Sequence, residues 1–200
     1  MSPPASDTPP AAPLPPHPTR WIAAVDRLSD LAGRAVLWLL GAMTVLGAFN
    51  AVARYGGRFV GIDFSSNAYL ELQWYLFSAV WLAGGAYALR HDAHVRVELL
   101  LGRLGERGRA WVDLVGGVLF LVPFAAFMLV VSWPTVAESW RVREVSPDPG
   151  GLVRYPVKAM ILLGFALLLL QAVAEVAKRV AVLRGLAVAH HAEPDPREAA

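Results

Sequence analysis

The chain has 200 residues, of which 56% are hydrophobic and only 17% are charged, and its mean hydropathy of +0.46 is typical of an integral membrane protein. Its formal net charge of +2 comes without any long basic stretch, which argues against a nucleic-acid-binding function. Because the chain contains no cysteine, disulfides, thiolate nucleophiles and Cys-based zinc or iron–sulfur sites are excluded.

The first 19 residues contain eight of the 15 prolines, with Ser, Thr and Ala between them. Such a segment has too little apolar content to fold, so residues 1–19 are predicted to form a disordered cytoplasmic tail. A cleavable signal peptide would place its short apolar core in this segment. Here the first apolar run begins only after Arg34 and is long enough to remain as a membrane anchor.

Residues 20–34 separate this tail from the first apolar run. Thr19 could cap a short helix here, with Trp21 and Leu28 on an apolar face and Asp26 among the charged residues that lie mostly opposite. This pattern predicts an amphipathic helix at the membrane surface, with Trp21 at the depth of the lipid headgroups. The alternative is a cytosolic extension of the first membrane span.

Four apolar runs follow, and each approaches or reaches the roughly 17–25 residues that a helix needs to cross a bilayer. None contains a charge near its middle. A soluble protein of this size would have too little polar surface to cover four such helices. The sequence therefore predicts an all-α integral membrane protein whose transmembrane domain, residues 35–184, has spans at 35–53, 72–89, 114–133 and 159–177 and precedes a cytoplasmic tail, residues 185–200.

The distribution of positive charges predicts the orientation of these spans. Twelve of the 18 Lys and Arg residues lie in the N-terminal segment, in the loop between the second and third runs and in the C-terminal segment, whereas six lie in the other two loops. Since cytoplasmic loops are enriched in Lys and Arg, both termini are predicted to be cytoplasmic.

The apolar runs hold few residues that could carry chemistry. Glu71, Asp113 and Glu175 lie at the ends of runs, and Pro123 could kink the third helix. A transporter that works alone would need ionisable groups or broken helices near the bilayer midplane. We therefore expect no cargo pathway within this chain alone, and the absence of a convergent catalytic set of residues argues against an enzyme.

Glu71 stands at the outer boundary of the second span, close in sequence to Trp74. Its carboxylate could pair with Arg54, with Arg58 or with a cation of a partner subunit. The alternative is a solvated acid at the start of a helix, a position that the helix dipole favours.

The last turns of the fourth span carry a polar face with two interpretations. Glu175 precedes Lys178 by three residues and Arg179 by four, which is an ordinary spacing for ion pairs within a helix, and Gln171 lies one turn earlier on the same face. Local stabilisation of the helix is the favoured interpretation. A polar contact to another helix is the alternative.

His91 and His94 lie three residues apart, a spacing that can bring two imidazoles to one metal ion. Histidine pairs at loop boundaries are common, however, and no third ligand is evident. No predicted span contains a histidine that could serve as an axial haem ligand. We therefore expect neither a metal nor a cofactor.

Two further features also allow two interpretations each. Small residues in the spans would let helices approach closely, either within the protein or against a partner subunit, and these are Gly41, Gly47, Ala79, Ala83, Gly84, Gly85, Gly116 and Gly117. The third loop, residues 138–151, carries Pro, Gly and mixed charges around Trp140 and is either a docking surface or a simple connection.

Several short motifs together resemble a known family. They are Asp63-Phe64-Ser65-Ser66-Asn67-Ala68-Tyr69-Leu70-Glu71-Leu72-Gln73-Trp74-Tyr75-Leu76-Phe77, Gly85-Ala86-Tyr87, His94-Val95-Arg96-Val97-Glu98, the stretch 146–152 and Pro156-Val157-Lys158. From about Trp21 to Arg184 the chain resembles the small permease subunit of tripartite ATP-independent periplasmic (TRAP) transporters, the DctQ type.

The resemblance implies a division of labour in a bacterial inner membrane. In such systems a soluble periplasmic protein captures an organic acid, and a large membrane subunit carries it inward, driven by an ion gradient. The small four-helix subunit braces the large permease subunit and helps to dock the periplasmic substrate-binding protein, so these two proteins and membrane lipid are the expected partners. We expect six residues to shape these contacts, namely Arg54, Glu71, Trp74, His94, Arg96 and Trp140.

Two other kinds of membrane protein compete with this interpretation. The main alternative is a structural or assembly subunit of another inner-membrane complex, such as a respiratory or secretion machine. A stand-alone small transporter is a third possibility, which the uncharged interiors of the spans argue against.

Overall fold

The computed structural model describes residues 20–60, 66–93 and 105–184, and almost all of this part of the chain is helical. The predicted tails, residues 1–19 and 185–200, lie outside the described residues. The helices are α1 (Arg20–Val60), α2 (Asn67–Arg90), α4 (Glu106–Gly116), the π-helical turn η1 (Gly117–Leu121), α5 (Val122–Arg141) and α6 (Tyr155–Leu183). The segments α4, η1 and α5 follow one another without a break and form one long rod.

Residues 20–34 do not form a separate helix. They continue directly into the first apolar run, so that α1 is a single helix of 41 residues. This corresponds to the second alternative above, an extension of the first span. Ile22 and Ser29 are buried in this extension, because it packs against the rest of the protein.

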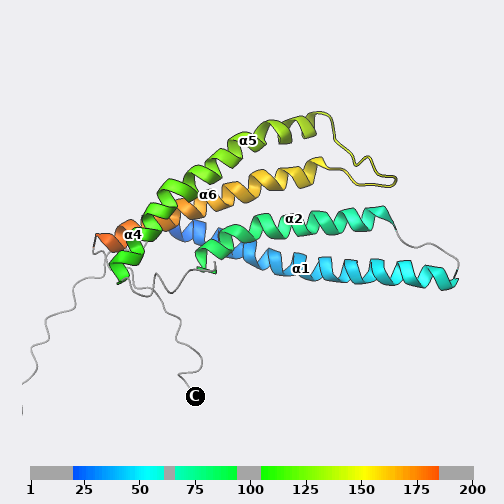
Figure 1. Ribbon diagram of the computed structural model, residues 1–200, viewed down its shortest axis with the longest axis horizontal. Coiled ribbons are helices and arrows are strands. Elements are labelled where there is room, and N and C mark those ends of the chain that lie inside the picture. The colour runs from blue at the N-terminus through cyan, green and yellow to red at the C-terminus, as the bar shows by residue number, and fades with distance from the viewer. Residues whose placement is uncertain (1–19, 61–65, 94–104, 185–200) are drawn as a thin grey trace, which may run out of the picture.

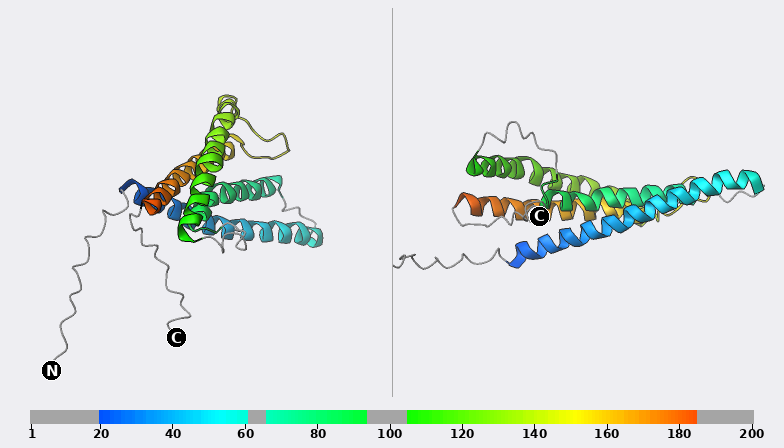
Figure 2. Two further views of the ribbon diagram at one scale, coloured as in Figure 1. Left: turned by 60° about the vertical axis from the view of Figure 1, so that its left-hand side comes forward. Right: turned by 90° about the horizontal axis from the view of Figure 1, so that it is seen from below.

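The four rods lie side by side in the order α1, α2, α6, α5 (Figure 1). The α1–α2 and α5–α6 pairs are antiparallel hairpins, while α2 and α6 run in the same direction and join the two hairpins at the centre. Figure 2 shows that the second hairpin is inclined to the first. The rods therefore make a single layer, in which α1 and α5 form the two edges, rather than a compact bundle.

Three of the four rods have the length and apolar composition of a membrane span. These candidate spans are Arg20–Gly57, Arg107–Arg141 and Tyr155–Leu183. The fourth rod, α2, has 24 residues but begins with several polar side chains, and it does not reach the same hydropathy. The prediction of an all-helical protein with four helices is thus confirmed.

The expected irregularity in the third rod is a π-helical turn just before Pro123. Proline has no N–H to donate to the carbonyl one turn earlier, and its ring clashes with that carbonyl in a regular α-helix. In η1 the helix is widened, and the Val122 N–H donates to the Gly117 carbonyl five residues back.

The buried positions of the described residues are mostly small. Ala86, Ala125 and Ala174 are fully buried, whereas Trp38 is 83% exposed and Phe59 is 91% exposed. Small residues let helix backbones approach closely within a membrane. Large apolar side chains can face the lipid there without a cost in free energy, because lipid tails are equally apolar. The broad faces of the layer are consequently apolar and free to contact lipid or another subunit.

Candidate functional site

Polar contacts between elements concentrate at the two ends of the layer. At the end where α2 and α6 begin, residues of the third loop meet α2 and α6, and we call this group the loop cluster: Glu71, Ser139, Glu144, Ser146, Leu152, Arg154 and Lys158. At the opposite end, α1, α2, α4 and α6 meet in the helix-end cluster: Asp26, Ser29, Asp30, Arg90, His91, Asp92, Asp113, Gln171, Glu175, Lys178 and Arg179.

Glu71 fixes the third loop to the first turns of α2. Its carboxylate accepts a hydrogen bond from the Ser146 hydroxyl and another, of 2.6 Å, from the Leu152 backbone N–H. Among the described residues no contact joins Glu71 to Arg54, which is exposed on α1. The side chain of Arg58 lies outside the description. Of the alternatives given above, a pair with Arg54 is thus not formed, and the Glu71 carboxylate contacts the third loop instead, because the loop folds back over it.

Glu144 fixes the same loop to α6. It accepts a 2.7 Å hydrogen bond from the Ser139 hydroxyl and pairs with the Lys158 ammonium. These hydrogen bonds lower the pKa of Glu144 below the usual value for a glutamate, and the bond from Lys158 has the larger effect, followed by the bond from Ser139. A carboxyl with a lowered pKa stabilises the fold above its unfolded pKa and loses this contribution as the pH falls, so the loop is held firmly at neutral pH.

Aromatic packing completes this end of the molecule. The rings of Trp140 and Tyr155 pack edge to face with centroids 4.7 Å apart, and the Arg143 guanidinium lies 5.9 Å from the centre of the Tyr155 ring. Arg143 adopts a φ of 51°, where the chain turns sharply after α5. Trp140 nevertheless stays about half exposed, so the loop presents an aromatic and basic surface to its surroundings.

Replacing Glu71 with Gln is expected to loosen the third loop without unfolding the helices. The amide keeps the size of the side chain but loses the charge that strengthens both hydrogen bonds. Hydrogen–deuterium exchange of the full chain in mild detergent should show faster exchange at the Leu152 amide and in the neighbouring residues of the loop.

Glu138→Gln provides the matched control for this experiment. Glu138 lies at the same end of the molecule, but its bonds to Arg141 stay within one turn of α5 and do not reach α2. Exchange of the Leu152 amide should therefore remain as in the wild type. Unchanged loop exchange in Glu71→Gln would show that this carboxylate does not hold the loop.

Gln171 forms the centre of the helix-end cluster. Its side chain is completely buried, and its carbonyl oxygen accepts a 2.7 Å hydrogen bond from the equally buried Ser29 of α1. Its amide nitrogen donates to Asp26 of α1 at 3.1 Å and to Glu175 of α6 at 2.9 Å. Lys178 lies 2.8 Å from both of these carboxylates. The Gln171 side chain thus joins α6 to α1, and the charged groups around it form ion pairs with one another.

The polar face around Glu175 makes both local pairs within α6 and polar contacts to another helix. Glu175 pairs with Lys178 three residues later, as expected for local stabilisation, and Gln171 and Lys178 also reach across to α1. Arg179 does not pair with Glu175. It lies 3.4 Å from Asp92 and 3.3 Å from Asp113, and so ties α6 to the end of α2 and to α4.

The acidic residues of the α1 extension face the protein rather than water. Arg90 of α2 pairs with Asp30 and donates to the backbone carbonyl of Asp26, and His91 Nε2 lies 3.1 Å from Asp30. The sequence predicted only that Asp26 lies among the charged residues opposite the apolar face of this segment. The missed signal is the complementarity of two acids, four residues apart, to the cations that end α2 and α6.

The remaining predicted residues are located as follows. Trp74 is 76% exposed on α2, Trp140 is exposed in the last turn of α5, and Arg54 is exposed near the end of α1. His94 and Arg96 lie outside the described residues. Within the described ranges, no group of three His, Asp or Glu side chains is arranged to hold a metal ion.

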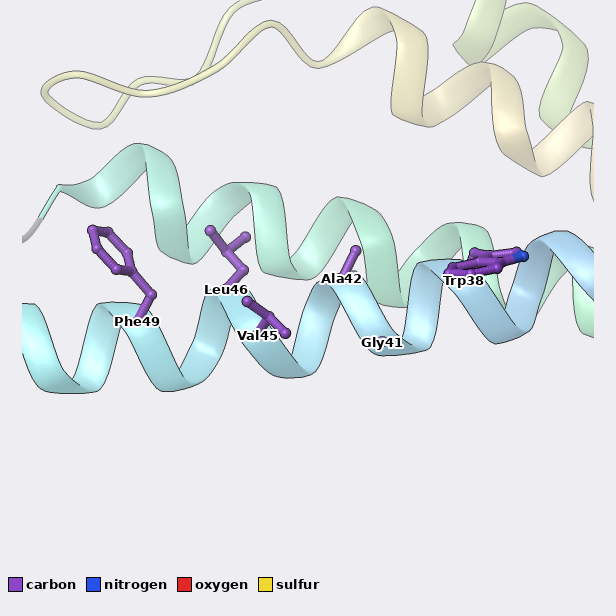
Figure 3. A pocket seen from close by; sticks show the side chains of 6 residues that line it. All are labelled: Trp38, Gly41, Ala42, Val45, Leu46 and Phe49. Atoms are coloured by element: carbon purple, nitrogen blue, oxygen red, sulfur yellow. The ribbon is translucent and has the colours of Figure 1, made fainter.

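An apolar groove follows one face of α1. It has a volume of about 690 Å³ and is lined by Trp38, Gly41, Ala42, Val45, Leu46 and Phe49. Figure 3 shows these residues succeeding one another along the helix. Nothing lies within 4 Å of the position that a Cβ of Gly41 would occupy, so this part of the groove is open. An edge helix with such a surface is suited to contact the apolar surface of another membrane protein.

Comparison with known proteins identifies the family. Residues 43–182, well over half of the chain, match the family described as "Tripartite ATP-independent periplasmic transporters, DctQ component". No curated protein and no solved structure matches the chain significantly. The match covers the second part of α1, residues 43–60, together with all of α2, α4, η1, α5 and the loop cluster and nearly all of α6. It makes the chain a membrane component of a transporter rather than an enzyme. The chain belongs to the DctQ component family of TRAP transporters.

Proposed function

We propose that this chain is the small membrane subunit that braces the large permease subunit of a TRAP transporter and helps to dock the periplasmic substrate-binding protein. The complex would take up an organic acid across the bacterial inner membrane, driven by an ion gradient. In this arrangement α2 is the fourth membrane span, and both termini are cytoplasmic.

The main support for this proposal is the absence of charged side chains from the span interiors, between the two polar ends of the layer. Residues 35–53, 72–89, 114–133 and 159–174 contain no Asp, Glu, Lys, Arg or His. Secondary transporters bind substrates and coupling ions near the bilayer midplane through ionisable groups or unwound helices. A chain without such groups is suited to hold a larger subunit in place, and transport then belongs to that subunit.

The position of α2 supports a fourth span. Its 24 residues correspond to a length of about 36 Å, which exceeds the hydrocarbon thickness of a bilayer. It packs between α1 and α6, two helices that are themselves long enough and apolar enough to span. Four spans place Arg20 and Arg184 on one side, the side that carries twelve of the 18 positive charges together with the α2–α4 connection.

The two candidate contact surfaces suit different partners. The α1 groove is apolar and lies on an edge helix, as a contact with the membrane-embedded large subunit requires. The loop cluster lies at the end of the layer where α2 and α6 begin. The exposed Trp140 and the basic Arg143 beside it suit a water-soluble partner such as the binding protein.

Co-purification with the large subunit, combined with substrate uptake, tests the proposal. Alanine replacements of the six candidate residues are examined one at a time, and those of exposed Trp74 and Trp140 are expected to leave the fold intact. Trp74→Ala should lower recovery of the large subunit severalfold, because truncation of a large aromatic anchor removes much of a local contact energy. Trp140→Ala should lower uptake with recovery unchanged.

A matched control is Phe120→Ala, which removes an exposed aromatic side chain from η1, at a distance from α1 and from the loop cluster. It should change neither quantity. Unchanged recovery and uptake in all six variants would contradict the assignment of these residues. Recovery of a respiratory or secretion complex in place of a permease would favour the alternative of an assembly subunit.

A further inference from the structure

A cavity of about 580 Å³ opens between the first turns of α2 and α6, beneath the third loop. Its lining combines apolar, aromatic and charged side chains: Asn67, Leu70, Glu71, Trp74, Tyr75, Ser78, Asp148, Arg154, Val157 and Lys158. The residues from Asn67 to Ser78 extend along α2 for about 16 Å at the usual rise of a helix. The cavity is thus long, and its lining includes the first turns of α2 and α6. Both helices begin at the same end of the layer (Figure 1).

Two opposite charges in this lining, those of Arg154 and Asp148, form no direct ion pair with a described residue, and Glu71 and Glu144 act on Arg154 only at longer range. The Arg154 guanidinium, which is only partly exposed, has no carboxylate oxygen within 4 Å and contacts the Ser146 hydroxyl at 3.4 Å. The backbone N–H of Asp148 donates to the Ser146 hydroxyl, but within the described residues the Asp148 carboxylate accepts no hydrogen bond. In contrast, Glu71 and Lys158 are engaged with Ser146 and Glu144. One cation and one anion therefore remain available to a ligand.

The buried Tyr75 hydroxyl also lines this cavity. It makes no hydrogen bond of good geometry within the described residues, although the Arg154 guanidinium lies close to it. Buried hydroxyl groups are normally hydrogen-bonded, because an unsatisfied one costs free energy. A phosphate oxygen beside Arg154 could accept from both groups.

The apolar part of the lining indicates a lipid. Leu70 and Val157 line the cavity together with the strongly exposed Trp74. Tryptophan is enriched at the depth of lipid headgroups, where its ring contacts acyl chains and its N–H contacts water. A phospholipid would place its glycerol and upper acyl carbons against these side chains and its headgroup against the charged ones.

The balance of charge indicates the class of headgroup. Glu71, Glu144 and Asp148 surround Arg154 and Lys158, so a purely anionic ligand would leave Asp148 unpaired and meet like charge. A headgroup that carries a phosphate and an ammonium matches both available charges. We propose that this cavity binds one aminophospholipid such as phosphatidylethanolamine, with its phosphate at Arg154 and its ammonium at Asp148.

Native mass spectrometry of the purified full chain tests this site. The protein is exposed to equal amounts of phosphatidylethanolamine and phosphatidylglycerol in mild detergent, and the retained lipid is identified. The wild type should retain one phosphatidylethanolamine in preference to phosphatidylglycerol. Arg154→Gln should retain about tenfold less, as expected from the loss of a charge-assisted hydrogen bond. Asp148→Asn should lose the preference between the two lipids, because only the ammonium distinguishes them at this position.

Arg141→Gln is the matched control, since Arg141 is an exposed arginine of the same end that pairs with Glu138 outside the cavity. It should retain lipid as the wild type does. Equal retention of both lipids by the wild type, or unchanged retention in Arg154→Gln, would overturn the proposal. Displacement of the lipid by millimolar inorganic phosphate would do so as well, because the site would then select free phosphate.

If Arg154→Gln does not fold, the lipid preference of Asp148→Asn is sufficient to test the site. Asp148 is an exposed loop residue, so its replacement should leave the fold intact. The measurement uses no other subunit. Its failure would therefore leave the proposed bracing function standing, and loss of co-purification with the permease would leave the lipid site standing.

Discussion

Gly164→Ala is expected to separate α2 from α6 and to destabilise the protein by about 2 kcal/mol. A Cβ at this position would lie 2.6 Å from the Cβ of Leu82 and 2.8 Å from its backbone carbonyl oxygen. Backbone atoms cannot rotate away as a side chain can, so the central pair of helices has to move apart. Thermal unfolding in mild detergent should show a clearly lower midpoint.

The helix displacement can be measured directly, because the chain contains no cysteine. Phe77→Cys and Leu163→Cys place one spin label on an exposed position of each helix. The distance between the labels should increase when Gly164→Ala is added to this pair.

Gly41→Ala is the matched control, since a Cβ at Gly41 meets nothing within 4 Å. The isolated protein should be unchanged or slightly more stable, because alanine favours a helix over glycine by up to about 1 kcal/mol. A Gly164→Ala variant as stable as Gly41→Ala would show that α2 and α6 are not in backbone contact at this point.

Gln171→Leu is expected to cost about 3 kcal/mol, because it leaves a buried hydroxyl unsatisfied and removes a donor from two carboxylates. Leucine is close to glutamine in size, so the loss is one of hydrogen bonds rather than of volume. The partners affected are Ser29, Asp26 and Glu175. Thermal unfolding in detergent should show a lower midpoint, and α1 should become more susceptible to proteolysis near residue 29.

A double-mutant cycle separates this interaction from general damage. Ser29→Ala combined with Gln171→Leu should be less destabilising than the sum of the two single changes, since they remove two ends of one hydrogen bond. Thr44→Val is the control, because the Thr44 hydroxyl bonds only to the Leu40 carbonyl of its own helix. Strict additivity of the two changes would contradict a direct Ser29–Gln171 bond.

These two positions help to explain how a single layer of helices can be stable. A layer of helices buries less surface than a bundle, so its stability depends more on a few close contacts between helices. Gly164 brings the central helices into backbone contact, the helix-end cluster joins four helices at one end, and the loop cluster joins α2 to α6 at the other. The broad apolar faces between these contacts remain free for lipid and for a larger subunit.

The glycines show where local sequence is informative about packing and where it is not. Gly47 and Gly117, both expected at close helix contacts, lie against Gln73 and Val176, whereas Gly41, Gly85 and Gly116 meet open space. Among the glycines within helices, the two closest approaches occur at Gly33, against Tyr87, and at Gly164, against Leu82, and neither glycine was among those predicted. A small residue permits close approach, but the rotation of each helix about its axis decides which small residues meet a neighbour.

The sequence by itself determined the helical class, the boundaries of the apolar runs, the uncharged span interiors and the family, because each of these depends on residues close together along the chain. Only the tertiary structure decided that the rods form a layer, that the 20–34 segment continues α1, and that Glu71 binds the third loop. Apart from Glu175, the hydrogen-bond partners of Glu71 and Gln171 are 75 to 145 positions away in sequence. Such pairs follow from the relative register and rotation of packed helices, which no local pattern of hydropathy specifies.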